Sequence, residues 1–142
     1  MRTVKELLGS KPMNIWSITP EASVFQALEL MAEKEIGALV VLSGSKLVGL
    51  LSERDYARKV ILKGKASKET RVREIMTDKL ITIRPETSID ECMALMTDKR
   101  IRHLPVLEGE RLVGMISIGD VVKAIISEQK FIIQQLENYI TA

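Results

Sequence analysis

The sequence contains little of what secreted, membrane and nucleic-acid-binding proteins usually need. Its only cysteine is Cys92, so no disulfide can form within the chain, and we expect a cytoplasmic protein in a reducing compartment. No apolar run approaches the ~20 residues of a membrane span, and residues 1–6 lack the apolar segment of a secretory signal. A net charge of +2 and an aromatic fraction of 4% give no reason to expect nucleic acid or a membrane as a partner.

The residue groups that carry catalysis or hold metals are scarce as well. His103 is the only histidine and has no second histidine or cysteine at ligand spacing, so we expect no metal site. The chain offers no nucleophile beside a base, no acid–base pair and no Walker-type loop. We therefore expect a protein that is not an enzyme and holds no catalytic cofactor. Cys92 falls on the apolar face of a predicted helix, which favours a buried structural thiol.

What the chain does contain is an internal repeat. Residues 18–55 align with residues 83–120 at an offset of 65 positions and without a gap. The identical pairs include Pro20 with Pro85, Ser23 with Ser88, Met31 with Met96, Gly49 with Gly114, Ser52 with Ser117 and Asp55 with Asp120. Chance does not place so many identities in one register, so we divide the chain into two motifs, residues 1–66 and 67–142.

Each copy is predicted to form a β-α-β-β-α unit. A short strand ends at a proline, which suits that place because proline has no N–H to donate. Ser23 with Gln26, and Ser88 with Glu91, have the capping-box spacing of a helix start, and apolar residues follow at helical spacing. The later strands are predicted at residues 38–42, 47–51, 103–107 and 112–116, with a second helix after each pair. We therefore expect a mixed α/β fold, with the two tandem units packed about a pseudo-two-fold axis through their sheets.

The last predicted helix, from about residue 119 onward, is longer than its counterpart in the first copy and carries a broad apolar stripe. The stripe consists of Val122, Ile125, Ile126, Ile132, Ile133, Leu136 and Ile140. It either packs onto the same domain or covers another subunit, and its length favours a homodimer.

Each copy also places a Ser-x-x-Asp spacing where a strand passes into a helix, with Ser52 and Asp55 in the first copy and Ser117 and Asp120 in the second. One interpretation is structural, because serine at the N-cap and an acid in the first turn both stabilise a helix start. The other is functional. A carboxylate offers two acceptor oxygens to the cis-diol of a ribose, while the serine and nearby N–H groups meet a phosphate. The spacing alone leaves both open, and both roles can coexist.

Four stretches resemble the CBS motif, the cystathionine-beta-synthase domain. The second copy carries the resemblance in KRIRHLPV (residues 99–106) and LVGMISIGDV (112–121), and the first in IGALVV (36–41) and VGLLSERD (48–55). The pair covers nearly the whole chain, which therefore resembles a stand-alone pair of CBS motifs, a Bateman module. The resemblance implies a regulatory module that binds AMP, ADP, ATP or NAD in the cleft between the motifs and signals to a separate partner protein.

The resemblance also implies which residues bind the nucleotide, because in the family each adenine pocket is completed from the opposite repeat. One pocket would set Ser52, Arg54 and Asp55 against Leu80, Ile81, Ile101 and Arg102, and the other would set Ser117 and Asp120 against Ile15, Trp16, Ile36 and Gly37. A phosphate needs charge-assisted donors, which Arg102 and His103 offer where the first copy has Gly37 and Ala38. Arg54, Arg58 and Lys59 add positive charge after Ser52, so the Asp55 pocket is predicted to be the better nucleotide site.

A second class of function stays open at this point. The long apolar stripe also suits a dimeric scaffold that binds a partner enzyme and has no physiological nucleotide. The basic segment 63–71 is more typical of a solvated linker than of a nucleic-acid patch, because no platform of aromatic side chains accompanies it.

Overall fold

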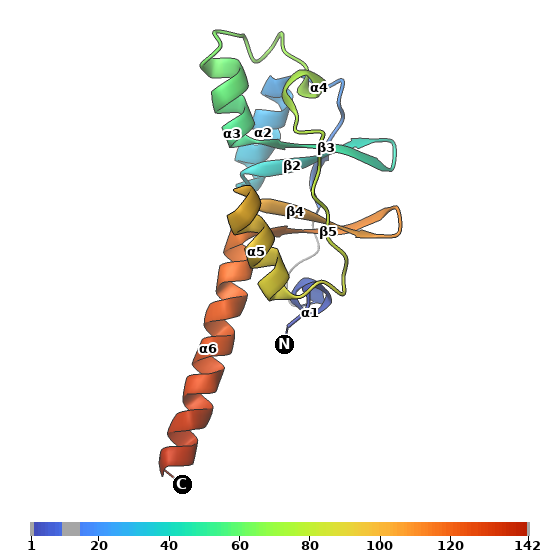
Figure 1. Cartoon of the computed structure of the whole chain (residues 1–142). Coiled ribbons are helices and arrows are strands. Elements are labelled where there is room, and N and C mark those ends of the chain that lie inside the picture. Colours follow the sequence, from blue (N-terminus) through green and yellow to red (C-terminus); the bar gives the residue numbers. More distant parts are fainter. Residues whose placement is uncertain (1, 10–14, 142) are drawn as a thin grey trace. The chain divides into compact units, whose positions relative to one another are not determined.

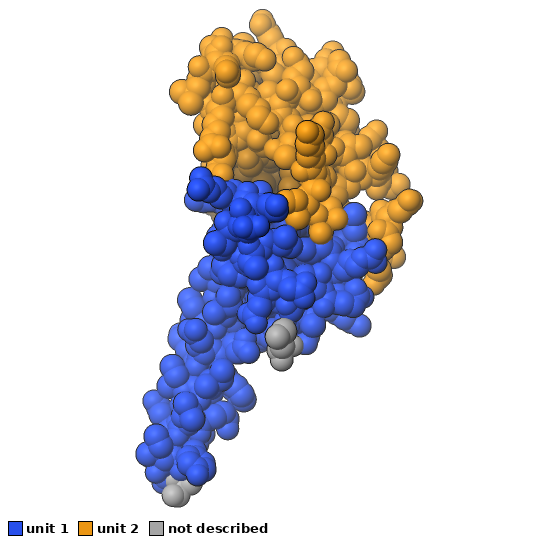
Figure 2. All heavy atoms as spheres, in the orientation of Figure 1, with its two compact units in different colours: residues 1–13, 83–107, 114–142 blue, residues 14–82, 108–113 orange. Residues whose placement is uncertain are grey.

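The computed structural model describes residues 2–9 and 15–141 and divides the chain into two compact units (Figure 2). Unit 1 comprises residues 1–13, 83–107 and 114–142, and unit 2 comprises residues 14–82 and 108–113. The body of the first repeat therefore lies in unit 2 and most of the second repeat in unit 1. The mixed α/β fold class predicted from the sequence is confirmed, with strands and helices in both repeats.

Unit 2 contains a three-stranded sheet in the order β1-β2-β3, of which Figure 1 labels the hairpin β2-β3. Its elements are β1 (Ser17–Ile18), α2 (Val24–Lys34), β2 (Ala38–Ser43), β3 (Lys46–Ser52), α3 (Glu53–Tyr56), the π-helix η1 (Ala57–Ile61) and α4 (Val72–Ile75). Strand β1 pairs with β2 in parallel, and β2 pairs with β3 as an antiparallel hairpin. The turn of this hairpin holds Gly44 at φ +64°, a left-handed conformation that glycine adopts without steric strain.

Most of the second repeat lies in unit 1 and has a similar order of helices and strands. Its elements are α5 (Ile89–Lys99), β4 (His103–Glu108), β5 (Arg111–Ser117) and α6 (Ile118–Thr141), of which the hairpin residues 108–113 belong to unit 2. Unit 1 also contains α1 (Val4–Gly9). Strands β4 and β5 form a two-stranded sheet, and Ile83 bridges Val106 in parallel. That bridge is the counterpart of the pairing between Ile18 and Val41 in the first repeat. The four later strands are thus confirmed, each extended by a residue or two. The predicted first strands are shorter than expected, because β1 ends two residues before Pro20 and the second copy has only the isolated bridge at Ile83.

The predicted helix starts are confirmed in detail. At α2 the amide of Gln26 donates to Ser23 Oγ at 3.1 Å and the amide of Ser23 donates to Gln26 Oε1 at 3.0 Å, which completes the capping box. At α5 the amide of Glu91 donates to Ser88 Oγ at 3.1 Å. Both helices end on a left-handed residue that is not glycine, Glu35 in α2 and Arg100 in α5, each at φ 54°.

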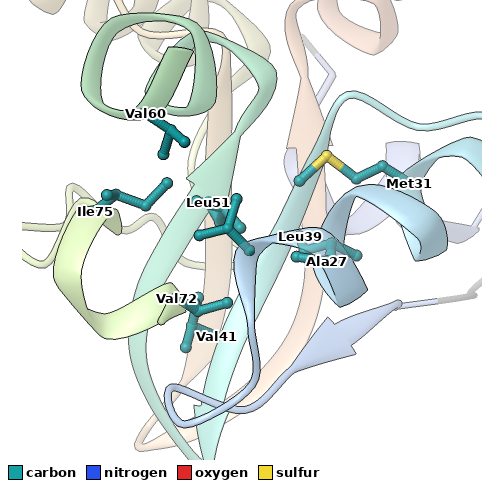
Figure 3. Packing of buried hydrophobic residues seen from close by; sticks show 9 residues of the cluster. Ala27, Met31, Leu39, Val41, Leu51, Val60, Val72 and Ile75 are labelled. Carbon is teal, nitrogen blue, oxygen red and sulfur yellow. The ribbon is translucent and has the colours of Figure 1, made fainter. Parts of the chain in front are cut away.

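The core of unit 2 consists of apolar side chains drawn from the sheet and from the helices that cover it (Figure 3). Its buried members are Val24, Ala27, Met31, Leu39, Val41, Leu51, Val60, Val72 and Ile75. Most counterparts in the second repeat are buried as well, among them Ile89, Cys92, Met96, Leu104, Val106 and Ile116. The internal repeat therefore extends to the hydrophobic core, since equivalent positions are buried in both copies.

One exchange of segments was not predicted from the sequence. Helix α4 pairs with the first repeat, because the amide of Val72 donates to the carbonyl of Ala22 at 2.9 Å. Helix α1 makes the matching contact with the second repeat, since the amide of Val4 donates to the carbonyl of Thr87 at 2.8 Å. Each repeat is thus covered by the short helix that precedes the other repeat in the sequence. The sequence does contain a signal that α1 and α4 are equivalent, because VKELL (4–8) matches VREIM (72–76). This match has an offset of 68 residues rather than 65.

The long C-terminal helix is confirmed as α6, of 24 residues. Its first turns are packed, with Val121 and Ala124 buried, whereas every described residue from Ile126 to Thr141 is exposed. The large apolar side chains in this exposed part are Ile126, Phe131, Ile132, Ile133, Leu136, Tyr139 and Ile140. Packing within the chain, one of the two interpretations of the stripe, therefore accounts only for the beginning of the helix.

Candidate functional site

The Ser-x-x-Asp spacing of the first repeat forms a closed set of hydrogen bonds where β3 passes into α3. The amide of Asp55 donates to Ser52 Oγ at 3.1 Å, and Asp55 Oδ2 accepts from the amide and the hydroxyl of Ser52 at 3.0 and 3.1 Å. Ser52 stays extended, with φ −121° and ψ 163°, and its side chain caps the helix. The structural interpretation of this spacing is confirmed at Asp55.

The other oxygen of the Asp55 carboxylate faces two further donors. Thr77 Oγ1 and Lys59 Nζ each lie 3.3 Å from Asp55 Oδ1. Lys59 Nζ also donates to the carbonyl of Ile75, at the end of α4, at 2.9 Å. Asp55 is 9% exposed, so this carboxylate is nearly buried and is surrounded by donors on both oxygens. Such an arrangement suits an ionised acid, because a buried charge is costly unless it is paired and hydrogen-bonded.

The second repeat has the same capping geometry where β5 passes into α6. The amide of Ser117 donates to Asp120 Oδ2 at 2.8 Å, and the amide of Asp120 donates to Ser117 Oγ at 3.2 Å. The surroundings differ by sequence, because the positions of Lys59 and Thr77 are taken by Ala124 and Gly9. The two Ser-x-x-Asp sites are therefore alike in backbone and unequal in the side chains around them.

The residue just before the second strand of each repeat lies beside the Ser-x-x-Asp turn of its own repeat. The amide of Glu53 donates to the carbonyl of Gly37 at 3.0 Å, and the amide of Ile118 donates to the carbonyl of Arg102 at 2.9 Å. Ile36 and Gly37 thus join Ser52 in unit 2, and Ile101 and Arg102 join Ser117 in unit 1. Arg102 is exposed, and His103 beside it is half-buried.

A cavity of about 340 Å³ opens in unit 2 next to this turn. It is lined by Leu28, Met31, Ala32, Glu35, Ile36, Gly37 and Glu53. Two of the predicted nucleotide-binding residues, Ile36 and Gly37, belong to this lining. A Cβ atom added to Gly37 would meet Glu53 Oε1 at 3.6 Å, an ordinary contact, so space alone does not require glycine here. Most of the lining residues are apolar, and two of them, Glu35 and Glu53, carry carboxylates.

The remaining predicted residues are divided between the units. Ser52, Arg54, Asp55 and Ile81 lie in unit 2, and Ile101, Arg102, His103, Ser117 and Asp120 lie in unit 1. The two pockets proposed from the resemblance each combine residues of both units, and they stay predictions. Of the cations expected near Asp55, Lys59 is in contact with it, while Arg54 and Arg58 are exposed on the same turn.

Thr77 is the contact residue that sequence reasoning missed. It follows α4, in the segment that leads from the first repeat to the second, and forms a two-way backbone bridge with Leu50 of β3. The 65-residue register ends before this segment, so nothing in that alignment connects Thr77 with Asp55. The second register, at an offset of 68, places Thr77 opposite Gly9 and identifies it as a position at which the copies differ.

Cys92 and possible metal ligands add no chemistry to these turns. The Cys92 thiol is buried, and burial, with a smaller contribution from the charge of Glu91, raises its pKa to about 11. A thiol held protonated in this way is a weak nucleophile. Within residues 2–9 and 15–141, histidine, cysteine and carboxylate side chains form no group of three that could hold a metal ion. Over the same residues no helix is long and apolar enough to cross a membrane.

The comparisons with known proteins agree with this geometry. The family model for the CBS domain matches residues 4–62 and 72–127. The chain is 42% identical, over 97% of its length and 71% of the relative's, to the mitochondrial CBS domain-containing protein CBSX3 of Arabidopsis thaliana. A crystallised protein with CBS domains from Burkholderia ambifaria is 53% identical, with a TM-score of 0.87 over 90% of this chain and 96% of that one.

A second solved structure similar to this chain contains a ligand. It is CBSX2 in complex with AMP, which is 26% identical, with a TM-score of 0.76 over 91% of this chain and 99% of that one. The family model, the relatives and the doubled fold lead to the same assignment. The chain belongs to the CBS domain family and is built of two CBS repeats.

Proposed function

We propose that this chain is a regulatory module that binds an adenine nucleotide and does not change it chemically. The observation that carries the proposal is the pair of Ser-x-x-Asp turns, each of which presents a carboxylate and backbone amides at a strand-to-helix junction. A carboxylate can accept both hydroxyls of a ribose, and a helix start favours a phosphate. The AMP complex of the related CBSX2 supports the same ligand class, which comprises AMP, ADP, ATP and NAD.

The nucleotide would bind in clefts between the CBS repeats. The residues proposed to form them are Ser52, Arg54, Asp55, Ile81, Ile101, Arg102, His103, Ser117, Asp120, Ile36 and Gly37. Binding would then favour one packing of the repeats over others, because a ligand shifts only an equilibrium between states that it binds unequally. A separate protein, which the chain regulates and which is not a part of it, would respond to that shift.

The ranking of the two sites is a prediction that single variants can test. The cations that follow Ser52 favour the Asp55 site, and Lys59 is indeed in contact with Asp55. The other reason for the ranking is the Arg102 side chain, whose part in the Asp55 site stays a prediction; its carbonyl accepts from the amide of Ile118. We expect Asp55→Asn to weaken AMP binding more than Asp120→Asn. Asparagine keeps an acceptor oxygen for the cap and removes the charge, so helix α3 is retained in the comparison.

Calorimetric titration of AMP and of NAD into the purified protein tests the proposal. We expect saturable binding of at least one of them to the wild-type chain and weaker binding to both Asp→Asn variants. Absence of heat at millimolar nucleotide would refute nucleotide sensing. Equal losses in the two variants would refute only the ranking of the sites.

We further propose that the chain is a homodimer held in part by α6. The exposed segment from Ile126 onward is barely longer than the ~12–15 residues below which an isolated helix is marginal in water, so packing against a second copy would stabilise it. Ile133→Glu should shift the protein from dimer to monomer in sedimentation velocity, whereas Gln134→Glu, which lies between the polar residues Lys130 and Asn138 on the helix surface, should not. An unchanged dimer in Ile133→Glu would refute this interface.

The alternative function is a dimeric scaffold with no physiological nucleotide, and the exposed stripe on α6 is the observation that favours it. A partner captured equally by wild type and by Asp55→Asn, with or without AMP, would support the scaffold over the sensor. Both proposals describe a protein that is not an enzyme, with the cytoplasm as its expected location.

A further inference from the structure

The contacts of Lys59 carry an inference that rests on the proposed function and adds ligand selection to it. Asp55 Oδ2 is already an acceptor for the amide and the hydroxyl of Ser52. Asp55 Oδ1 has two donors 3.3 Å away, the Thr77 hydroxyl and the Lys59 ammonium, and only the ammonium carries a charge. A ribose hydroxyl that binds Oδ1 must therefore share this oxygen with Thr77 and Lys59 or displace one of them, and the ammonium is the donor whose displacement breaks an ion pair.

Displacement has different consequences for a nucleoside and for a nucleotide. A nucleoside gives the ammonium nothing in exchange for the carboxylate, so its binding includes the loss of an ion pair between a nearly buried carboxylate and a partly exposed ammonium. A nucleotide brings a phosphate, which is a stronger partner for an ammonium than a hydroxyl is. We propose that Lys59 makes the Asp55 site select phosphorylated adenosine over adenosine itself.

The structure leaves Lys59 room to change partners. Its side chain is 44% exposed, and its flexible four-carbon stem carries three donors. One donor reaches the Ile75 carbonyl at 2.9 Å, which can hold the ammonium near the site after it leaves Asp55. Lys59 also lies in the π-helix η1, where the amide of Leu62 donates to the carbonyl of Ala57, five residues back, at 3.1 Å. Such single turns inside helices often occur at functional sites.

The second repeat contains the complementary case. Ala124 takes the place of Lys59, in the regular helix α6, so the Asp120 site has no ammonium from this position. Selection by Lys59 is therefore a property of one repeat. A chain with two such unequal sites can respond to the phosphorylation state of adenosine at one of them.

The test compares AMP with adenosine, by calorimetry, on the wild type and on Lys59→Met, which keeps the length of the stem and removes the charge. We expect the dissociation constant of adenosine to fall about threefold and that of AMP to rise about threefold, so that the preference for AMP drops roughly tenfold. Lys59→Arg should retain most of the preference. Lys46→Met, the same change at an exposed lysine of β3 in the same unit, is the matched control and should leave the ratio unchanged.

An AMP-to-adenosine ratio in Lys59→Met within twofold of the wild-type ratio overturns the inference. Failure of the proposed function would give a different result, because the wild type would then bind neither AMP nor adenosine. A purely structural role for Lys59 would weaken both ligands alike and leave the ratio unmoved. Thermal unfolding verifies that Lys59→Met is folded. Lys59→Gln, which keeps a donor toward the Ile75 carbonyl, carries the same comparison if the methionine variant does not fold.

Discussion

Two matched glycines provide a direct test of the segment exchange. Gly49 of β3 and Gly114 of β5 occupy equivalent places in the repeats, and each lies under the short helix that covers its sheet. A Cβ atom at Gly49 would come within 2.7 Å of Met76 Sδ and 3.1 Å of the Thr77 carbonyl oxygen. A Cβ at Gly114 would come within 2.6 Å of Leu8 Cδ2. Real Cβ atoms do not approach other atoms below 3.0 Å, so in both alanine variants the nearest atoms of the covering segment must shift.

The two displacements differ in what has to move. At Gly114 the near atoms all belong to the end of the Leu8 side chain, which can rotate away. At Gly49 the Thr77 carbonyl is main chain and is held by the amide of Leu50 at 2.9 Å. Overpacking a core typically costs about 1–3 kcal/mol. We expect a loss of about 2 kcal/mol in the free energy of unfolding for Gly49→Ala, and of about 1 kcal/mol for Gly114→Ala.

Chemical denaturation and thermal unfolding measure the difference. At roughly 3 °C per kcal/mol for a chain of this size, Gly49→Ala should lower Tm by about 6 °C and Gly114→Ala by about half of that. Gly37→Ala is the control, because its Cβ would meet only Glu53 Oε1 at 3.6 Å. A Gly49→Ala protein as stable as the wild type, or less affected than Gly114→Ala, would refute the close packing of the segment 76–77 against β3.

Three further predictions concern two residues, Cys92 and Glu35. Because burial raises the pKa of Cys92 to about 11, the native thiol should resist alkylation at pH 8 and react only after unfolding. Rapid alkylation of the native protein would contradict the burial of this thiol. The unfolded chain loses this proton near pH 9 and the folded chain does not, so the free energy of unfolding should fall above pH 9 in the wild type by up to ~1.4 kcal/mol per pH unit. Cys92→Ala, which introduces the residue that stands at position 27, should lack that component, and identical slopes would refute it. Glu35 ends α2 at φ 54°, a conformation that glycine adopts without strain. Glu35→Gly should therefore raise the free energy of unfolding, measured in urea, by about 1 kcal/mol. A decrease would show that the glutamate side chain stabilises the fold by more than the backbone strain costs.

The parts of the fold that the sequence predicted are those decided by local chemistry. Capping by Ser23 and Ser88 depends on residues three positions apart, and strand limits depend on the turn glycines, so a single register was enough to find them. The exchange of α1 and α4 depends instead on contacts between segments far apart in the chain, such as Val4 with Thr87. Thr77 escaped for the same reason, because its partner Asp55 lies 22 residues away, across the sheet.

The Ser-x-x-Asp turns illustrate a different limit. The spacing was compatible with a helix cap and with a ribose site, because both use the same oxygens, and only the resemblance to the CBS motif favoured the ribose site. The structure confirms the cap at Asp55 and at Asp120. It also identifies Lys59 as a competitor for one of these oxygens, which the alignment of the repeats presented only as extra positive charge.

Nucleotide binding without chemistry is the central claim, and equilibrium dialysis against AMP followed by mass spectrometry of the retained ligand tests it most directly. The account predicts that the wild-type chain retains AMP, that the AMP recovered from it is unaltered, and that Asp55→Asn/Asp120→Asn retains much less. The account would be contradicted if the wild-type chain retained no more AMP than the double variant does, or if the added AMP were recovered as a different compound.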